Sequence, residues 1–147
     1  MTRRHPSSVL FCCDHNALRS PMAEGIAKQL CGSGMDVQSA GVLHDSEIDG
    51  MAVAVCAEIG VPLTRHKARS FEEMVSRGGS IEGFELIVAL SPEAARQARL
   101  LAAPGLVEEW DIPPPVYPDG PKPAILAAYR VTRDRLRARI AARFATR

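Results

Sequence analysis

Short runs of apolar residues alternate with helical patterns along this chain, and the alternation limits the fold more than any other feature of the sequence. Strands are predicted at residues 9–12, 37–40, 86–90 and 106–109, and helices at residues 20–30, 52–59, 71–75, 92–102 and 124–144. Strands separated by helices favour parallel pairing, right-handed crossovers and helices on both faces of an α/β sandwich. Ligands bind such sheets beyond the carboxyl ends of the strands, so we expect a site there.

The composition excludes several classes of protein. The 147 residues are the usual size of one domain, and we expect residues 1–147 to form a single unit. A net charge of +1 gives no reason to expect nucleic acid, and no run of about 18 apolar residues predicts a membrane span. The cysteines fit neither a disulfide framework nor a zinc site, which favours a reducing cytoplasm; they are Cys12, Cys13, Cys31 and Cys56.

The segment between the first predicted strand and the first predicted helix has the properties of an anion site. A helix N-terminus presents unpaired backbone N–H groups, and Arg19 adds a planar fork that holds two oxygens of a phosphate. The same field stabilises a thiolate, so Cys13 is the candidate nucleophile and Ser20 can donate a hydrogen bond to it. The predicted phosphate-binding residues are Asp14, His15, Asn16, Ala17, Leu18, Arg19 and Ser20.

The surrounding residues extend this pattern into a resemblance. Cys13 and Arg19 stand in a C-x5-R-S loop with Asn16 at its third position, followed by Pro21 and by Ala23-Glu24; Ser39-Ala40-Gly41 and His66-Lys67-Ala68-Arg69 come later. The chain thus resembles the low-molecular-weight protein tyrosine phosphatases, a family that includes related arsenate reductases. The resemblance implies a three-layer sandwich around a four-stranded parallel sheet, and supporting hydrogen bonds from Ser39 and His66 to the loop. It also implies a cysteinyl-phosphate intermediate that forms without metal or other cofactor.

One part of the family pattern is missing. The family places an aspartate in the late loop as general acid, and many bacterial relatives have it four residues after the tryptophan, where this chain has Pro114. Proline carries no titratable proton. Two carboxylates of the same loop, Asp111 and Asp119, are the candidate substitutes. His15 is interpreted as an exposed, variable position of the phosphate loop.

Three functions remain open from the sequence. The first is a phosphatase acting on a phosphorylated protein or a small phosphomonoester. The second is an arsenate reductase that uses an external thiol, because residues 91–103 contain no cysteine for an internal relay. The third is a phosphate- or phosphopeptide-binding protein that lacks the acid step. The residues on either side of the predicted pocket do not support specificity for tyrosine.

Overall fold

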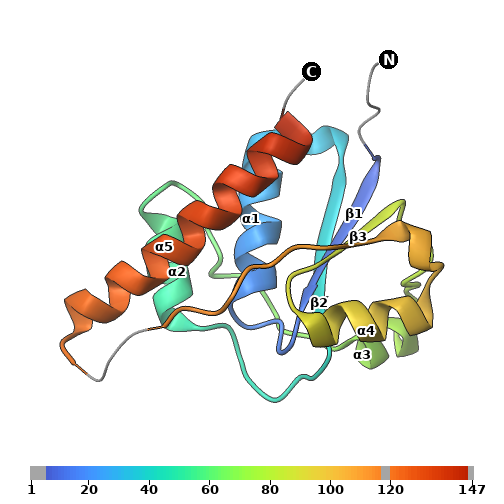
Figure 1. Cartoon of the computed structure of the whole chain (residues 1–147), viewed down its shortest axis with the longest axis horizontal. Coiled ribbons are helices and arrows are strands. Elements are labelled where there is room, and N and C mark those ends of the chain that lie inside the picture. Colours follow the sequence, from blue (N-terminus) through green and yellow to red (C-terminus); the bar gives the residue numbers. More distant parts are fainter. Residues whose placement is uncertain (1–5, 117–119, 146–147) are drawn as a thin grey trace.

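Four parallel strands form the centre of the protein (Figure 1). The structure, a computed structural model, describes residues 6–116 and 120–145. The strands are β1 (Ser8–Cys13), β2 (Asp36–Gly41), β3 (Leu86–Ala89) and β4 (Val107–Glu109), and they lie in the order β2-β1-β3-β4. Every pair is parallel, with Val9 opposite both Val37 and Leu86 and with Ile87 opposite Val107. The predicted four-stranded parallel sheet is confirmed.

Helices cover both faces of the sheet because side chains alternate along each strand. Val9 and Phe11 pack on one face with α1 (Arg19–Cys31), α2 (Gly50–Ala57) and α5 (Lys122–Ile140), which lie together on the left in Figure 1. Leu10 and Cys12 pack on the other face with α3 (Phe71–Ser76) and α4 (Pro92–Leu101). Two 3-10 turns, Gly32–Gly34 and Pro104–Leu106, and a π-helical turn, Ala141–Ala145, complete the elements.

An aromatic cluster anchors the chain after β4. Trp110 packs edge-on against Phe11 and is tilted against Phe144, with ring centroids 6.0 Å and 6.2 Å apart, and its backbone N–H donates to Ala89. The following residues, through Val116, form no helix or strand, and three consecutive prolines account for this. The segment therefore leaves the sheet from a fixed point and passes over the carboxyl end of β1.

Several bounds differ from the sequence prediction by one or more residues, and two of these differences have clear local causes. β1 includes Cys13, because this residue still pairs with Gly41 of β2. α2 begins at Gly50 rather than residue 52, because the Asp49 side chain caps it by accepting the backbone N–H groups of Met51 and Ala52. No helix within the described residues is both long enough and apolar enough to cross a membrane.

Candidate active site

Cys13 stands at the carboxyl end of β1, on the face that α1 covers. Its side chain is 3% exposed, and its sulfur lies 2.9 Å from the Ser20 hydroxyl oxygen. The backbone N–H of Ser20 also points at the sulfur, at 3.4 Å. Because no side chain caps the start of α1, the sulfur takes the place of a cap at the positive end of the helix dipole. These contacts hold the sulfur at the N-terminus of α1.

The backbone between Cys13 and α1 turns its carbonyls outward. The carbonyls of Cys13, Asp14, Asn16 and Ala17 accept, respectively, from the N–H groups of Val42, Leu43, the His66 ring and Asp49, at 2.8–3.1 Å. In contrast, the N–H groups of residues 14–18 donate to no backbone carbonyl of the described residues. A run of N–H groups left free beside a thiolate forms a nest for an anion. The arrangement suits a tetrahedral oxyanion bound next to the Cys13 sulfur.

Asn16 holds the shape of this loop from within. Its φ of 54° is in the left-handed region, which Asn tolerates better than most residues, and its side chain is fully buried. The amide nitrogen donates to the hydroxyls of Ser20 and Ser39, at 2.8 and 3.0 Å, and the amide oxygen accepts the backbone N–H of Arg69 at 3.0 Å. Every member of this network thus supports the orientation of Ser20 toward the thiol.

A second layer of polar residues supports that network. The Ser39 hydroxyl donates to the Glu24 carboxylate, and the His66 ring lies between the Asn16 carbonyl and Glu24, with Nδ1 3.9 Å from the carboxylate. The Arg69 guanidinium donates to the Ser39 carbonyl at 3.0 Å. The structure therefore places Ser39 and His66 beside the phosphate loop, as the family resemblance implies. The contributions of Glu24 and Arg69 to this support were not predicted.

The Arg19 guanidinium is held in position at the other side of the thiol. Nη1 donates to the carbonyls of Leu90 and Ile112, at 3.3 and 2.9 Å, and Nη2 lies 3.5 Å from the Asp14 carboxylate. Asp14 in turn accepts the Ser91 hydroxyl at 2.6 Å. The guanidinium has five N–H donors, so these contacts leave others for a phosphate oxygen. Its link to Ile112 also ties the late loop to the phosphate loop.

A cavity of about 260 Å³ opens beside Cys13 and Arg19. Pro114 lines it, so the late loop does reach the nucleophile, but at this point it presents an apolar ring. Asp111 is exposed and does not line the cavity, because it stands between two buried residues that turn its side chain away. Asp119 lies outside the described residues. Of the two predicted carboxylates the structure describes only Asp111, and it does not bring Asp111 to the cavity beside the thiol.

The opposite wall of the cavity comes from the loop between β2 and α2, which was expected at the site because it follows the second predicted strand, although its lining residues were not predicted. Ser46, Glu47 and Asp49 line the cavity there. The Tyr129 hydroxyl donates to Asp49 at 2.7 Å and thereby ties α5 to this wall. The sequence signal for this wall was the Ser39-Ala40-Gly41 segment that precedes the loop. A Cβ on Gly41 would lie 2.6 Å from the Asn16 backbone nitrogen, so the phosphate loop requires glycine at this position.

The other cysteines are separated from this chemistry. Cys12 points to the opposite face of the sheet, and burial together with the neighbouring Cys13 raises its pKa well above the ordinary value. Burial raises the pKa of Cys56 to about 11 and also raises that of Cys31. Within the described residues, no three His, Cys, Asp or Glu side chains come together as ligands for a metal ion. Cys13 is therefore the one described cysteine that lines the cavity.

Comparisons with known proteins agree with this geometry. The family described as low molecular weight phosphotyrosine protein phosphatase matches residues 8–146. A protein of Klebsiella pneumoniae described as a low molecular weight protein-tyrosine-phosphatase is 32% identical over 74% of this chain and 79% of its own length. A glutaredoxin arsenate reductase of Synechocystis is 25% identical over 90% of this chain and 92% of its own. The crystal structure of a T. tengcongensis low molecular weight protein tyrosine phosphatase superimposes with a TM-score of 0.71, at 26% identity over 90% of this chain and 94% of that one. The chain therefore belongs to the low molecular weight phosphotyrosine protein phosphatase family, whose members include both phosphatases and arsenate reductases.

Proposed function

We propose that the chain is a cysteine-dependent phosphomonoester hydrolase whose substrate is a phosphorylated protein or a small phosphomonoester. One observation carries the proposal: the N–H groups of residues 14–18, in the loop that joins Cys13 to Arg19, donate to no backbone carbonyl of the described residues, and the side chains of Cys13 and Arg19 line one cavity. A phosphoryl group in this position has its developing charge matched by fixed donors, and the donors need no rearrangement during the reaction. Catalysis would then consist largely of positioning and electrostatic stabilisation.

The proposed reaction has two steps. The Cys13 thiolate attacks phosphorus, the bond from phosphorus to the ester oxygen breaks, and the leaving alcohol takes a proton. Water then attacks the cysteinyl-phosphate, the S–P bond breaks, and inorganic phosphate leaves with the thiolate restored. Ser20 stabilises the thiolate at the start and end of the cycle through its hydroxyl and its backbone N–H. Arg19 binds the equatorial oxygens throughout.

The test is hydrolysis of p-nitrophenyl phosphate at mildly acidic pH by the wild-type chain and by Cys13→Ser. We expect turnover by the wild type and none by the variant, because a serine hydroxyl in this position is not ionised. Binding of inorganic phosphate by the variant, measured by calorimetry, shows that its loop is still folded. Wild-type protein that binds phosphate without Cys13-dependent turnover would point instead to a phosphate- or phosphopeptide-binding role.

Arsenate reduction is the second candidate, and the Synechocystis relative favours it. Arsenate has the shape and charge of phosphate and fits the same nest. Cys13 would attack arsenic and release water, and an external thiol would then reduce the adduct, giving arsenite and a disulfide. Cys12 and Cys56 are buried, so we expect no internal relay through them. Arsenate-dependent oxidation of glutathione or glutaredoxin, absent in Cys13→Ser, would identify this activity.

A further inference from the structure

The proposed hydrolysis needs a proton donor for the leaving oxygen, and the described part of the late loop, residues 110–116, offers none at the cavity. Pro114 occupies the wall where that loop reaches Cys13, and Asp111 lies outside the cavity. The expelled group of an unactivated ester is a poor leaving group unless it is protonated as the bond breaks. Among the described residues, the donor must therefore be another titratable side chain that lines the same cavity.

Besides Cys13 and Arg19, the described titratable residues that line the cavity are His15, Glu47 and Asp49. Asp49 is already engaged through both carboxylate oxygens, by the cap of α2 and by the Tyr129 hydroxyl. Glu47 has a side chain that is 81% exposed and bound to His44 at its outer end, 3.2 Å away. Among the described residues, His15 is left as the donor.

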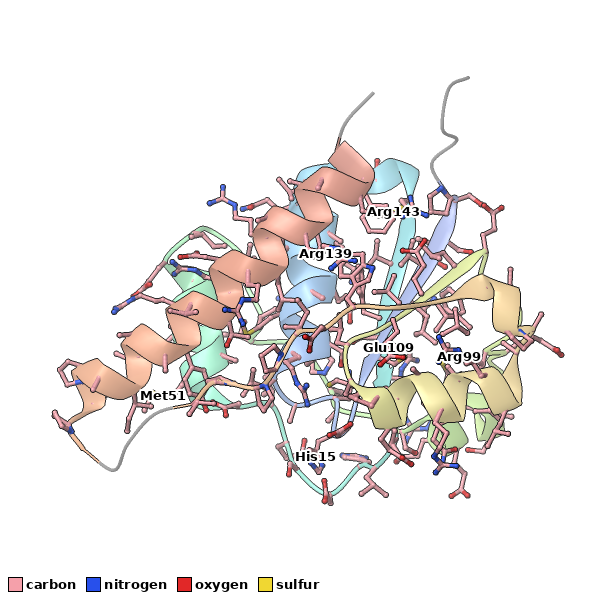
Figure 2. The ribbon with its side chains drawn as sticks, viewed as in Figure 1. His15, Met51, Arg99, Glu109, Arg139 and Arg143 are labelled. Carbon is pink, nitrogen blue, oxygen red and sulfur yellow. The ribbon has the colours of Figure 1, made fainter. Side chains whose placement is uncertain are left out.

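The position of the His15 ring is defined by a second loop. Its Nδ1 lies 2.7 Å from the Asp45 carboxylate, which belongs to the segment between β2 and α2. Figure 2 shows His15 at the lower edge of the molecule, beside that segment. The backbone on either side is held as well, by Leu43 donating to the Asp14 carbonyl and by His66 donating to the Asn16 carbonyl. The ring therefore has a fixed anchor at Nδ1, while Nε2 donates to none of the described residues.

A carboxylate bound to one imidazole nitrogen sets the tautomer and stabilises the imidazolium. The reciprocal effect is present in this pair, since the hydrogen bond from His15 lowers the pKa of Asp45. Besides Asp45, the charged side chains on the ring's side of the site are those that line the cavity with it, namely Glu47, Asp49 and Arg19.

We propose that His15, positioned by Asp45, is the general acid and base of this site; the assignment rests on the hydrolase function proposed above. In the first step Nε2–H of the imidazolium gives its proton to the leaving oxygen as the bond from phosphorus to that oxygen breaks. The ring becomes neutral. In the second step neutral Nε2 takes a proton from the attacking water while the S–P bond breaks. The imidazolium and the Cys13 thiolate are then both restored.

The experiment compares His15→Gln with the wild type on two substrates that differ in their leaving group. Phosphotyrosine expels a phenol with a pKa of about 10 and needs protonation, whereas p-nitrophenol leaves readily as its anion. We expect kcat/KM for phosphotyrosine to fall by about 10²–10³-fold and that for p-nitrophenyl phosphate by less than about tenfold. Inhibition by inorganic phosphate stays unchanged, because the N–H groups of the loop remain. His44→Gln is the matched control. His44 also binds two carboxylates, Glu47 and Glu73, but it is not part of the His15–Asp45 pair.

Asp45→Asn tests the positioning role. Asparagine still accepts a hydrogen bond from Nδ1, so we expect Asp45→Asn to keep most of the activity on phosphotyrosine, whereas Asp45→Ala removes the acceptor and should reproduce the leaving-group effect of His15→Gln. Equal losses on both substrates in His15→Gln would refute the role of His15, as would a leaving-group effect in Glu47→Gln instead. Wild-type protein that hydrolyses neither substrate would refute the hydrolase function itself and the assignment with it.

Discussion

Replacing Asn16 by alanine tests whether the phosphate loop is held by one buried amide. The substitution leaves the backbone N–H of Arg69 without its acceptor, which costs about 1–2 kcal/mol when the group is kept from water. The hydroxyls of Ser20 and Ser39 each lose one donor but keep another partner, at about 0.5–1 kcal/mol apiece. Alanine at a φ of 54° adds about 1 kcal/mol. The free energy of unfolding should fall by about 3–5 kcal/mol.

The measurement is urea unfolding followed through the fluorescence of Trp110, the single tryptophan, which is buried in the core. A loss of this size lowers the melting temperature by about 6–20 °C in a domain of this length. Asn16→Gly separates the two causes, because glycine loses the same hydrogen bonds but adopts the left-handed backbone freely. It should be about 0.5–1 kcal/mol more stable than Asn16→Ala.

Gln97→Ala is the control for loss of an amide, since Gln97 makes its contact on the surface of α4 and should change stability by less than about 0.5 kcal/mol. A loss below about 1 kcal/mol in Asn16→Ala, with an unchanged denaturant slope, would refute the reasoning. The amide would then be one of several redundant supports. In that case the loop would be held chiefly by its outward carbonyls.

Three further predictions follow from other parts of the structure. Gly41→Ala should reduce phosphate affinity measured by calorimetry, because the new Cβ meets the loop backbone at 2.6 Å, whereas Gly34→Ala, with open space around it, should bind normally. Glu58→Gln should lower the urea midpoint at pH 7. Hydrogen bonds from two arginines of α5 depress the pKa of Glu58 from 4.5 to about 2, so the contribution of the Glu58 carboxylate to the free energy of unfolding is fully present above pH 4.5. The difference from wild type should shrink as the pH falls from 4.5 toward 2; a difference that persists unchanged at pH 2.5 would contradict this. Iodoacetamide at pH 7 should alkylate Cys13 first, since burial holds the pKa of Cys56 at about 11, and inorganic phosphate should slow the reaction; labelling that phosphate does not slow would place the reactive thiol elsewhere.

The fold and the phosphate loop were predictable because their determinants are local. Strand–helix alternation predicted the parallel sheet, and the segment from Cys13 to Ser20 forms one continuous turn whose neighbours in sequence are its neighbours in space. The start of α2 was placed late because the cap on Asp49 precedes the apolar pattern.

The proton donor was not predictable for the opposite reason. The pairing of His15 with Asp45 joins residues 30 positions apart across a loop with no periodic pattern. The path of the late loop depends on Trp110, whose anchoring partner Phe144 lies at the far end of the chain. A carboxylate such as Asp111 can be counted in the sequence, but the side to which it points is decided by those distant contacts.

The outward carbonyls have a consequence for how this site can acquire new substrates. Because they bind the rest of the fold through main-chain oxygens, the side chains of Ala17 and Leu18 are not needed to hold the turn. Exchange at these two positions alters the size and polarity of the cavity wall, while the N–H groups beneath keep their directions. Substrate preference and phosphate binding thus depend on different atoms of the same loop, residues 13–18. The side chains determine the first and the backbone N–H groups the second, so one can change while the other is kept.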